Sequence, residues 1–481
     1  MKKNTKPKNV LTEKRVSQSW INSISTEEYS FLLKMSIHSS LMYNFAIYQI
    51  RQSFFKNMKH FEDHGSYGKL IEFKENYHIC KVNENFSILP NACSQQVLQI
   101  AHRDFNSFFG LLRKKSKGEY KADIKLPKYK KKNGETLLSN IVIQGKGVLL
   151  NKEKSSQYND VNVYAINASK NFKDLYSCDN TSHRFEFFVP KNIKKIDEIR
   201  IIPTGQYPVK FKIEVVYSVK IEQKKENNNS YLSIDPGLNN IAACFNSKNG
   251  SSFIIDGKYI KSINHYFNKK YAKLQSSIDT RKNKDLDIYD LIKKKNKISH
   301  KRNNKINDYF HRASKYIVEY CVKNNINKII IGENKEQKKN INIGKINNQN
   351  FVFIPHAKFK DILEYKARSK GIEVAREEES YTSKTSFIDL EPMKHQDKYL
   401  GKRTKRGIFR TKDGILINSD INGAANILRK YLESNGKFKE WSNLYFKEAS
   451  KGIVNYPRRL NLDVLLSELR FKKTKNSAIH C

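Results

Sequence analysis

Two aspartates lie nearly two hundred residues apart, and each stands at the boundary of a predicted structural element. Asp235 follows the apolar run 231–234 and precedes the turn pair Pro236-Gly237, after which a second apolar run covers 241–245. This pattern predicts two short strands joined by a tight turn, with one carboxylate held at the end of the first strand. A half-buried carboxylate is costly without a compensating partner. We therefore interpret Asp235 as a metal ligand, and a purely turn-forming role is the alternative.

Asp420 stands just before the residues INGAANIL, whose apolar members recur at helical spacing. Taken alone, it could simply cap that helix. Taken together with Asp235, it offers the hard oxygen ligands that Mg²⁺ or Mn²⁺ prefers. Two-metal phosphodiester cleavage needs about three or four such carboxylates, so a glutamate should complete the set.

The segments D-P-G and D-I-N-G-A-A-N-I resemble the first and third signature segments of RuvC-type nucleases. The overall pattern is similar to the TnpB (OrfB) proteins of bacterial insertion sequences, over most of residues 90–430. The resemblance implies a transposase-associated, RNA-guided DNA endonuclease that cuts by a two-metal RuvC mechanism. It implies Mg²⁺ or Mn²⁺ and a guide RNA as cofactors, and double-stranded DNA as the target.

Two glutamates compete for the third acidic position. The usual second RuvC segment ends in a glutamate, but here that slot is Gly332, and Glu333 follows one residue late. A slip of one residue on a strand turns the side chain to the opposite face. Glu379 lies three residues before Thr382 of T-S-K-T, which resembles a branch of TnpB-like and Fanzor proteins with a displaced catalytic glutamate. We predict Glu379, with Glu333 as the lower-ranked alternative and a solvated acidic run as the bland reading.

The segment 376–427 has no C-x-x-C pair, although common TnpB proteins place such pairs there. Its basic stretch resembles that of the zinc-free TnpB subgroup, so we predict no structural zinc. We expect this basic knuckle to contact DNA phosphates, and a mobile basic loop is the alternative. The candidate DNA-contacting residues of the knuckle are Lys402, Arg403, Lys405, Arg406 and Arg410. Lys128 and Lys130, which flank a tyrosine, predict a second backbone-contact strip.

The charge balance points to a polyanionic partner. The chain has 90 Lys and Arg residues against 48 Asp and Glu, a net charge of +42, and nucleic acid is the usual partner of such an excess. No segment approaches the length and apolarity of a membrane span, and no signal peptide is recognisable. We expect a soluble bacterial cytoplasmic protein without a membrane partner, associated with the nucleoid when bound to DNA.

The fold expected is a multidomain α+β protein: a helical bundle with a small barrel, then an RNase H-like (RuvC) α/β nuclease domain. Alternating strands and helices after residue 230 predict the last of these, and the resemblance implies that the barrel is oligonucleotide-binding-like. A capping box at Ser25–Glu28 and a cap at Asn91 predict two helices of the bundle. The expected domains are a basic segment with the first barrel strand (1–24), a helical recognition domain (25–118), the barrel (119–228), the nuclease domain (229–450) and a basic tail (451–481).

Three other functions fit parts of the same pattern. A nuclease-inactive, RNA-guided DNA-binding repressor would keep the guide and the DNA but lose carboxylates, whereas Asp235, Glu379 and Asp420 are all present. A strand-transferring DNA transposase would need a joining activity. A miniature type V CRISPR effector would differ only in its genomic neighbourhood.

Overall fold

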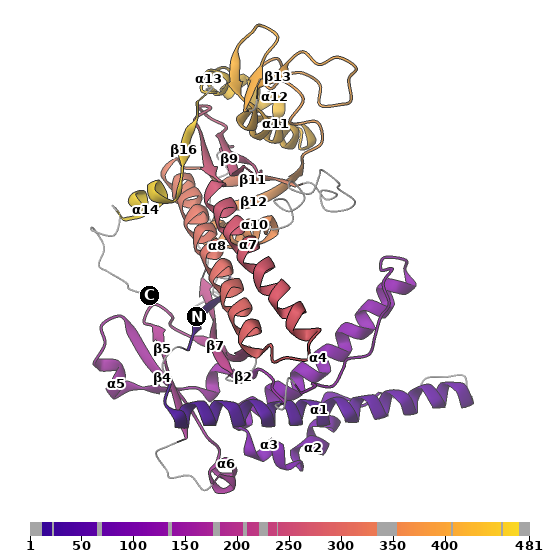
Figure 1. Cartoon of the computed structure of the whole chain (residues 1–481). Coiled ribbons are helices and arrows are strands. Elements are labelled where there is room, and N and C mark those ends of the chain that lie inside the picture. Colours follow the sequence, from indigo (N-terminus) through magenta and orange to yellow (C-terminus); the bar gives the residue numbers. More distant parts are fainter. Residues whose placement is uncertain are drawn as a thin grey trace, which may run out of the picture. The chain divides into compact units, whose positions relative to one another are not determined.

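The structure is a computed structural model, and the part of the chain that it describes forms two compact units, Met1–Lys220 and Ile221–Cys481 (Figure 1). The finer division into five domains stays a prediction. The described residues are 12–21, 24–64, 70–132, 137–176, 183–204, 209–220, 229–237, 239–333, 354–405, 407–453 and 456–470.

Two long helices form the body of the first unit. Helix α1 (Thr26–His64) starts at the predicted capping box: the Ser25 N–H donates to the Glu28 carboxylate at 3.0 Å, and the Glu28 N–H donates to Ser25 Oγ at 3.1 Å. Helix α4 (Asn91–Ser116) begins one residue earlier than predicted. Its cap is Pro90, in an extended conformation, and Asn91 is already helical, so the predicted cap at Asn91 is wrong.

Two short helices, α2 (Phe73–Lys81) and α3 (Glu84–Ile88), lie in a region whose sequence predicts irregular structure. Both are too short to show a clear helical period. They are held by burial of a few side chains, among them Cys80 and Phe86, in the core that α1 and α4 share. Tertiary packing therefore decides their conformation.

The strands of the first unit form two open antiparallel sheets. One has the order β1-β7-β6-β2 and the other the order β3-β4-β5. Their bounds are β1 Thr12–Trp20, β2 Ile141–Gln144, β3 Leu149–Asn151, β4 Val161–Asn167, β5 Arg184–Pro190, β6 Ile196–Thr204 and β7 Lys210–Lys220. A 3₁₀ turn (Gly145–Gly147) and helices α5 (Lys152–Ser156) and α6 (Lys170–Leu175) connect them.

The expected closed barrel is not found among the described strands. Strands β1 and β2 remain edges of one sheet, and β3 and β5 remain edges of the other. The apolar side chains of both sheets join those of α1 and α4 in one hydrophobic core. The bundle thus covers apolar surface that barrel closure would otherwise cover.

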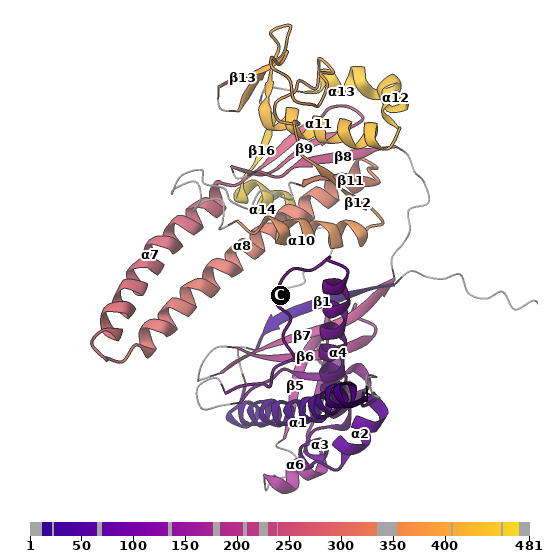
Figure 2. The ribbon, with the colours of Figure 1, turned by 90° about the vertical axis from the view of Figure 1, so that its right-hand side faces the viewer.

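The second unit is built on a six-stranded mixed sheet with the order β12-β11-β8-β9-β10-β16 (Figure 2). Strands β8, β9 and β10 form an antiparallel meander, β11 and β12 run parallel to β8, and β16 runs parallel to β10. The bounds are β8 Tyr231–Asp235, β9 Asn240–Asn246, β10 Ser252–Asp256, β11 Lys328–Glu333, β12 Glu373–Glu378 and β16 Arg458–Leu460.

Helices cover both faces of this sheet. Helices α8 (Tyr289–Lys323), α10 (His356–Arg368) and α14 (Leu462–Arg470) pack on one face, and α7 (Lys258–Lys282) pairs with α8. Helix α11 (Ser419–Ser434) packs on the other face, with α12 (Phe438–Trp441), a π-helical turn (Ser442–Phe446) and α13 (Lys447–Lys451) beyond it. Alternate strand residues enter the two cores, so a residue's place in a strand fixes its face.

A small antiparallel sheet, β13-β14-β15, precedes α11 and carries the basic stretch that the sequence analysis calls the knuckle. Its strands are Lys402–Lys405, Ile408–Arg410 and Leu416–Asn418. After α13, the predicted basic tail instead begins with the ordered strand β16 and helix α14, and residues 471–481 lie outside the described part. No helix within the described ranges is long and apolar enough to cross a membrane.

Candidate active site

Asp235 is the last residue of β8, on the sheet face that α11 covers. Its neighbour Ile234 points to the opposite core, because strand residues alternate between faces. A Cβ atom on Gly423 of α11 would lie 2.6 Å from Asp235 Oδ2. Glycine at position 423 therefore leaves the space that the Asp235 carboxylate occupies against the first turns of α11.

Asp420 lies in the first turn of α11 and does not cap the helix. The cap is Asn418, whose side-chain oxygen accepts from the N–H groups of Asp420 at 3.0 Å and Ile421 at 3.3 Å. The Asp420 carboxylate turns instead toward neighbouring strands. Its Oδ2 accepts from Asn240 Nδ2 at 2.5 Å, and its Oδ1 lies 3.6 Å from Arg403 Nη2.

Glu379 fills the space beside the glycine at the end of β11. A Cβ atom on Gly332 would lie 2.6 Å from Glu379 Oε1 and 2.7 Å from Ile427 Cδ1. Gly332 follows Ile331, which enters the opposite core, so position 332 faces α11 as Asp235 does. The Glu379 carboxylate thus lies against the slot in which the usual RuvC segment carries its own glutamate.

Glu333 lies one residue further along β11, and its carboxylate is held by Arg376 at 3.1 Å. Arg376 also bridges to Asp361 and Glu364 of α10, the helix on the opposite face of the sheet from α11. The Glu333 side chain therefore points to the face opposite α11, as strand alternation predicts for this position.

Electrostatic coupling joins the three carboxylates. Burial, followed by the charges of Glu379 and Asp420, raises the pKa of Asp235 to about 8, although Arg403 and Lys360 act in the opposite direction. Burial also raises the pKa of Glu379, with Lys360 opposing it. Lys360 donates to the Gly332 carbonyl at 2.6 Å. Carboxylates that repel each other in a partly desolvated place are stabilised when a cation binds between them.

This donor set fits a hard divalent cation, because all three side chains offer oxygen ligands. No group of three or more His, Cys, Asp or Glu side chains within the described ranges is drawn together tightly enough to hold a metal ion as it stands. Arg403 and Asn240 hold Asp420, and Lys360 lies near Glu379 and Asp235. These protein groups thus offset part of the negative charge of the carboxylates, as a bound metal ion would.

Two buried asparagines of α11, which the sequence analysis does not single out, anchor the turn after Glu379. Asn426 Nδ2 donates to the carbonyls of Thr382 at 3.0 Å and Thr385 at 2.8 Å. Asn422 donates to the Thr385 carbonyl at 2.8 Å and accepts from the Phe387 N–H at 3.0 Å. The available signal is two amides four residues apart on an otherwise apolar helix face.

The loop between β12 and the knuckle is closed by a buried carboxylate. Glu391 is fully buried, and its two oxygens accept from the N–H groups of Ser386 at 2.8 Å and Leu400 at 2.6 Å. Arg429 of α11 donates to the Glu391 carbonyl at 2.8 Å. The Glu391 carboxylate thus bonds residues near both ends of this loop, which contains no cysteine.

The basic residues of the knuckle separate onto two sides. Arg403 pairs with Phe409 in the strand register and turns toward Asp420. Lys402 and Arg410 pair with each other on the opposite side and are exposed, and Lys405 is exposed as well. Arg406 lies outside the described residues. Only Arg403 of the described set thus meets a predicted acidic site residue.

In the first unit, the segment carrying Lys128 and Lys130 runs along α1. The Asn44 side chain bonds both backbone groups of Lys130, at 2.7 and 3.0 Å. The Lys130 ammonium lies 4.5 Å from the centre of the Tyr43 ring, whereas Lys128 is exposed. A contact with a nucleic-acid backbone stays a prediction for both lysines.

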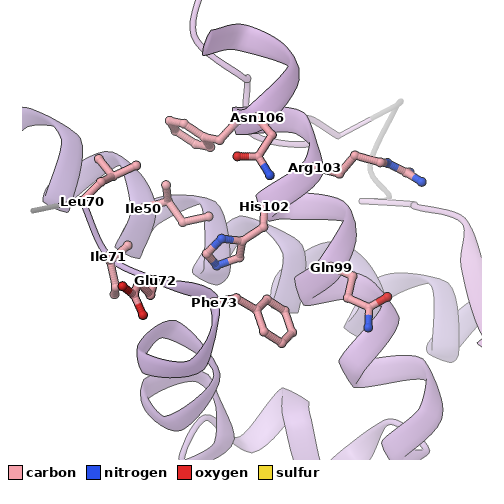
Figure 3. Close-up of a pocket in the computed structure, with 10 residues that line it drawn as sticks. Ile50, Leu70, Ile71, Glu72, Phe73, Gln99, His102, Arg103 and Asn106 are labelled. Carbon is pink, nitrogen blue, oxygen red and sulfur yellow. The ribbon is translucent and has the colours of Figure 1, made fainter. Parts of the chain in front are cut away.

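The same unit contains an open pocket between α1, α2 and α4 (Figure 3). His102 points into its centre, and its pKa is lowered by burial. It lies 3.0 Å from Asn76 and packs edge-on against Phe73. His102 therefore belongs to a packed contact in this pocket and not to an open polar helix face.

Two protein-family models match separate segments of the chain. Residues 214–338 match the family OrfB_IS605, described as a probable transposase, and residues 356–427 match the Cas12f1-like TNB domain. The TnpB-like protein ORF457 of Acidianus two-tailed virus is 26% identical over 422 residues, which cover 83% of each protein. The resemblance to TnpB is confirmed.

Further comparisons agree with this relationship. The TnpB-like protein MJ0751 of Methanocaldococcus jannaschii is 27% identical over 182 residues, 36% of this chain and 61% of that protein. The structure of Cas12f1 in a complex with sgRNA and target DNA matches with a TM-score of 0.53 and 14% identity, over 84% of this chain and 82% of that one. The chain therefore shares the mixed α+β, multidomain architecture of the Cas12f and TnpB proteins.

Proposed function

We propose that this TnpB-like protein is an RNA-guided, metal-dependent DNA endonuclease. The observation that supports the proposal is that Glu379 and Asp420 lie near enough to Asp235, beside α11, for their charges to raise its pKa. Asp235, Glu379 and Asp420 come from the end of β8, the residue after β12 and the first turn of α11. Burial is the largest cause of this rise in the pKa of Asp235, and the two charges add to it.

The strand order supports an RNase H-like (RuvC) assignment for the second unit. An antiparallel meander, β8-β9-β10, continues into β11 and β12, which run parallel to β8. Asp235 ends β8, Gly332 and Glu379 lie at the matching ends of β11 and β12, and Asp420 approaches from α11. In parallel strands these ends lie on one edge of the sheet, where ligands commonly bind.

The acidic residues Asp235, Glu379 and Asp420 would hold Mg²⁺ or Mn²⁺ as oxygen ligands. When bound, a pair of such ions would supply activation of the attacking water and stabilisation of the leaving 3′ oxygen. Residues of this chain would position the carboxylates for this role: Asn240 and Arg403 contact Asp420, and Gly332 leaves the space that Glu379 occupies. Glu333 is ranked lower because Arg376 already holds it.

The net charge of the chain and its similarity to known proteins support nucleic acids as its partners. An excess of 42 positive charges suits a chain that holds both a guide RNA and double-stranded DNA. In guided nucleases, base pairing reads the target, while the protein reads a short flanking motif and duplex shape. The exposed lysines and arginines of the knuckle would hold a DNA strand near the acids through phosphate contacts.

The test begins with the RNA that co-purifies with the full-length protein. That RNA is sequenced, and plasmids are built that match its variable end beside randomised flanks. With Mg²⁺, the wild type should cut matching plasmids, whereas Asp235→Asn, Glu379→Gln and Asp420→Asn should reduce the rate by several orders of magnitude, and Glu333→Gln should cut at close to the wild-type rate.

Other outcomes would overturn the proposal. Guide-dependent DNA binding by wild type and variants alike, without cutting, would identify a repressor. Products in which donor and target DNA are joined would identify a strand-transferring transposase. Loss of cutting only in Glu333→Gln would move the third acidic position from residue 379 to residue 333.

A further inference from the structure

The carboxylate of Asp420 is the end of a hydrogen-bonded chain that begins on the last strand of the sheet. Arg459 Nη1 of β16 donates to Asn240 Oδ1 at 3.0 Å, and Asn240 Nδ2 donates to Asp420 Oδ2 at 2.5 Å. Asn240 is 6% exposed, so its amide has little access to solvent. Two side chains that carry no acidic group thus connect β16 with the candidate active site.

The direction of the Asn240 amide follows from the chemistry of its two partners. A guanidinium only donates hydrogen bonds and an ionised carboxylate only accepts them. The Asn240 oxygen must therefore face Arg459, and its NH₂ group must face Asp420. If Arg459 were absent, the amide could turn by 180° and present its oxygen to the Asp420 carboxylate, which would repel it.

The backbone around Asn240 is also fixed, by the turn that follows Asp235. The Gly237 N–H donates to the Asn240 carbonyl at 2.9 Å, and a Cβ atom on Gly237 would lie 3.0 Å from that oxygen. The neighbouring Asn239 carbonyl accepts from the Gly257 N–H at 2.8 Å. The turn thus holds the Asn240 side chain at a defined place beside α11.

The register of β16 explains why Arg459 reaches this face of the sheet. Arg459 pairs with Ile254 of β10, which enters the core under α11, whereas Arg458 pairs with Phe253, which enters the opposite core. Residues side by side in a parallel pair share a face. Of the two adjacent arginines, only Arg459 can therefore lie on the side of Asp420.

We propose that Arg459 and Asn240 are positioning residues of the active site, through which the C-terminal strand holds Asp420 ready to bind metal. The inference rests on the proposed function, because it assigns a role relative to the acid cluster. Groups that orient a metal ligand through its free atoms raise metal affinity or activity about 10- to 100-fold. Strand β16 lies beyond both matched segments, which end at residues 338 and 427.

The experiment measures Mn²⁺ affinity by titration calorimetry on the full-length protein without DNA, and Mg²⁺-dependent plasmid cutting alongside. The variants are Asn240→Leu, Arg459→Met, their double variant and the matched control Arg458→Met, each checked by thermal unfolding. Asn240→Leu and Arg459→Met should each weaken Mn²⁺ binding about 10-fold or more. Arg458→Met should bind Mn²⁺ as the wild type does.

The double variant separates positioning from other roles of Arg459. If Arg459 acts only through Asn240, the double variant should bind Mn²⁺ as weakly as Asn240→Leu alone. Independent, additive losses would overturn the inference, because they would mean that Arg459 acts by its own charge or by packing. Unchanged Mn²⁺ binding in Arg459→Met would overturn it too. Failure of the wild type to bind Mn²⁺ or to cut would instead contradict the proposed function.

Discussion

The carboxylate of Glu379 lies where a side chain on Gly332 would have to lie: a Cβ atom at position 332 would approach Glu379 Oε1 to 2.6 Å. Gly332 lies in β11, and Glu379 directly follows the neighbouring parallel strand β12. Only one of the two positions can carry a large side chain on this face of the sheet. The absence of a side chain at 332 and the acidic side chain at 379 are therefore complementary.

Gly332→Ala should displace the Glu379 carboxylate and lower the rate of DNA cutting about 10-fold or more, by analogy with other disturbed ligand positions. The free energy of unfolding should change little, because the atom nearest to the added Cβ is at the flexible end of the Glu379 side chain. The rate of plasmid cutting and urea unfolding test this. Gly110→Ala is the control, since no atom lies within 4 Å of its Cβ.

The double variant Gly332→Glu with Glu379→Ala should recover part of the cutting activity that Glu379→Ala loses. It returns a glutamate to the usual RuvC slot and removes the side chain that fills this space. Activity no higher than that of Glu379→Ala would mean that the two positions are not interchangeable.

Asp235→Asn should stabilise the metal-free protein at pH 8 and have little effect near pH 4. Its pKa is raised from 3.8 to about 8, so the folded state holds this proton more tightly than the unfolded state does. The contribution to stability is complete below pH 3.8 and is lost as pH rises through about 8. Because one unit of pKa change corresponds to about 1.4 kcal/mol, we expect a gain of several kcal/mol at pH 8 from removal of this charge.

Urea unfolding at several pH values, with and without Mn²⁺, checks this sign. Mn²⁺ should raise the unfolding free energy of the wild type at pH 8 by binding the folded state, and it should raise that of Asp235→Asn far less. A variant that is destabilised equally at both pH values would show that Asp235 is a structural residue.

Arg403→Ala should have opposite effects on metal binding and on DNA cutting. The guanidinium lies 3.6 Å from Asp420 Oδ1 and is about half exposed, so its removal should raise Mn²⁺ affinity about two- to five-fold, as expected for an exposed ion pair. Cutting should fall, because we expect the Arg403 guanidinium to contact a DNA phosphate beside the acids. Lys402→Ala, on the opposite side of the knuckle, should weaken DNA binding without changing Mn²⁺ affinity. Parallel losses of Mn²⁺ affinity in both variants would contradict this division.

Glu391→Gln should lower the free energy of unfolding by about 1–3 kcal/mol, because one of the two N–H groups that the carboxylate bonds loses its acceptor. Those partners are the N–H groups of Ser386 and Leu400. Thermal unfolding measures the loss, and Glu448→Gln is the matched control, because that carboxylate is 65% exposed. A variant as stable as the control would show that Glu391 does not close the loop.

Strong local patterns make the strands of the second unit predictable. The apolar runs around Asp235 and before Gly332 form strands β8, β9 and β11 where the sequence predicts them. In the first unit, helix α1 begins at the capping box of Ser25, and helix α4 forms where the sequence predicts a second helix. In each case, local propensity and tertiary packing favour one structure.

Contacts between distant residues could not be predicted in this way. The barrel did not close because the helices bury the sheets' apolar faces, which strand patterns alone do not reveal. Asn240 and Glu391 show no periodicity of their own, and their roles depend on partners up to 219 residues away, as between Asn240 and Arg459. In the sequence, the preference for Glu379 over Glu333 rests on a resemblance and on strand alternation, whereas the space beside Gly332 that Glu379 fills depends on side-chain packing.

A crystal structure of the protein soaked with Mn²⁺ tests the central claim most directly. Anomalous difference maps would locate the metal without reference to any activity. The account predicts a peak within coordination distance of the carboxylates of Asp235, Glu379 and Asp420. A metal bound elsewhere, or one that takes Glu333 in place of Glu379, would contradict it.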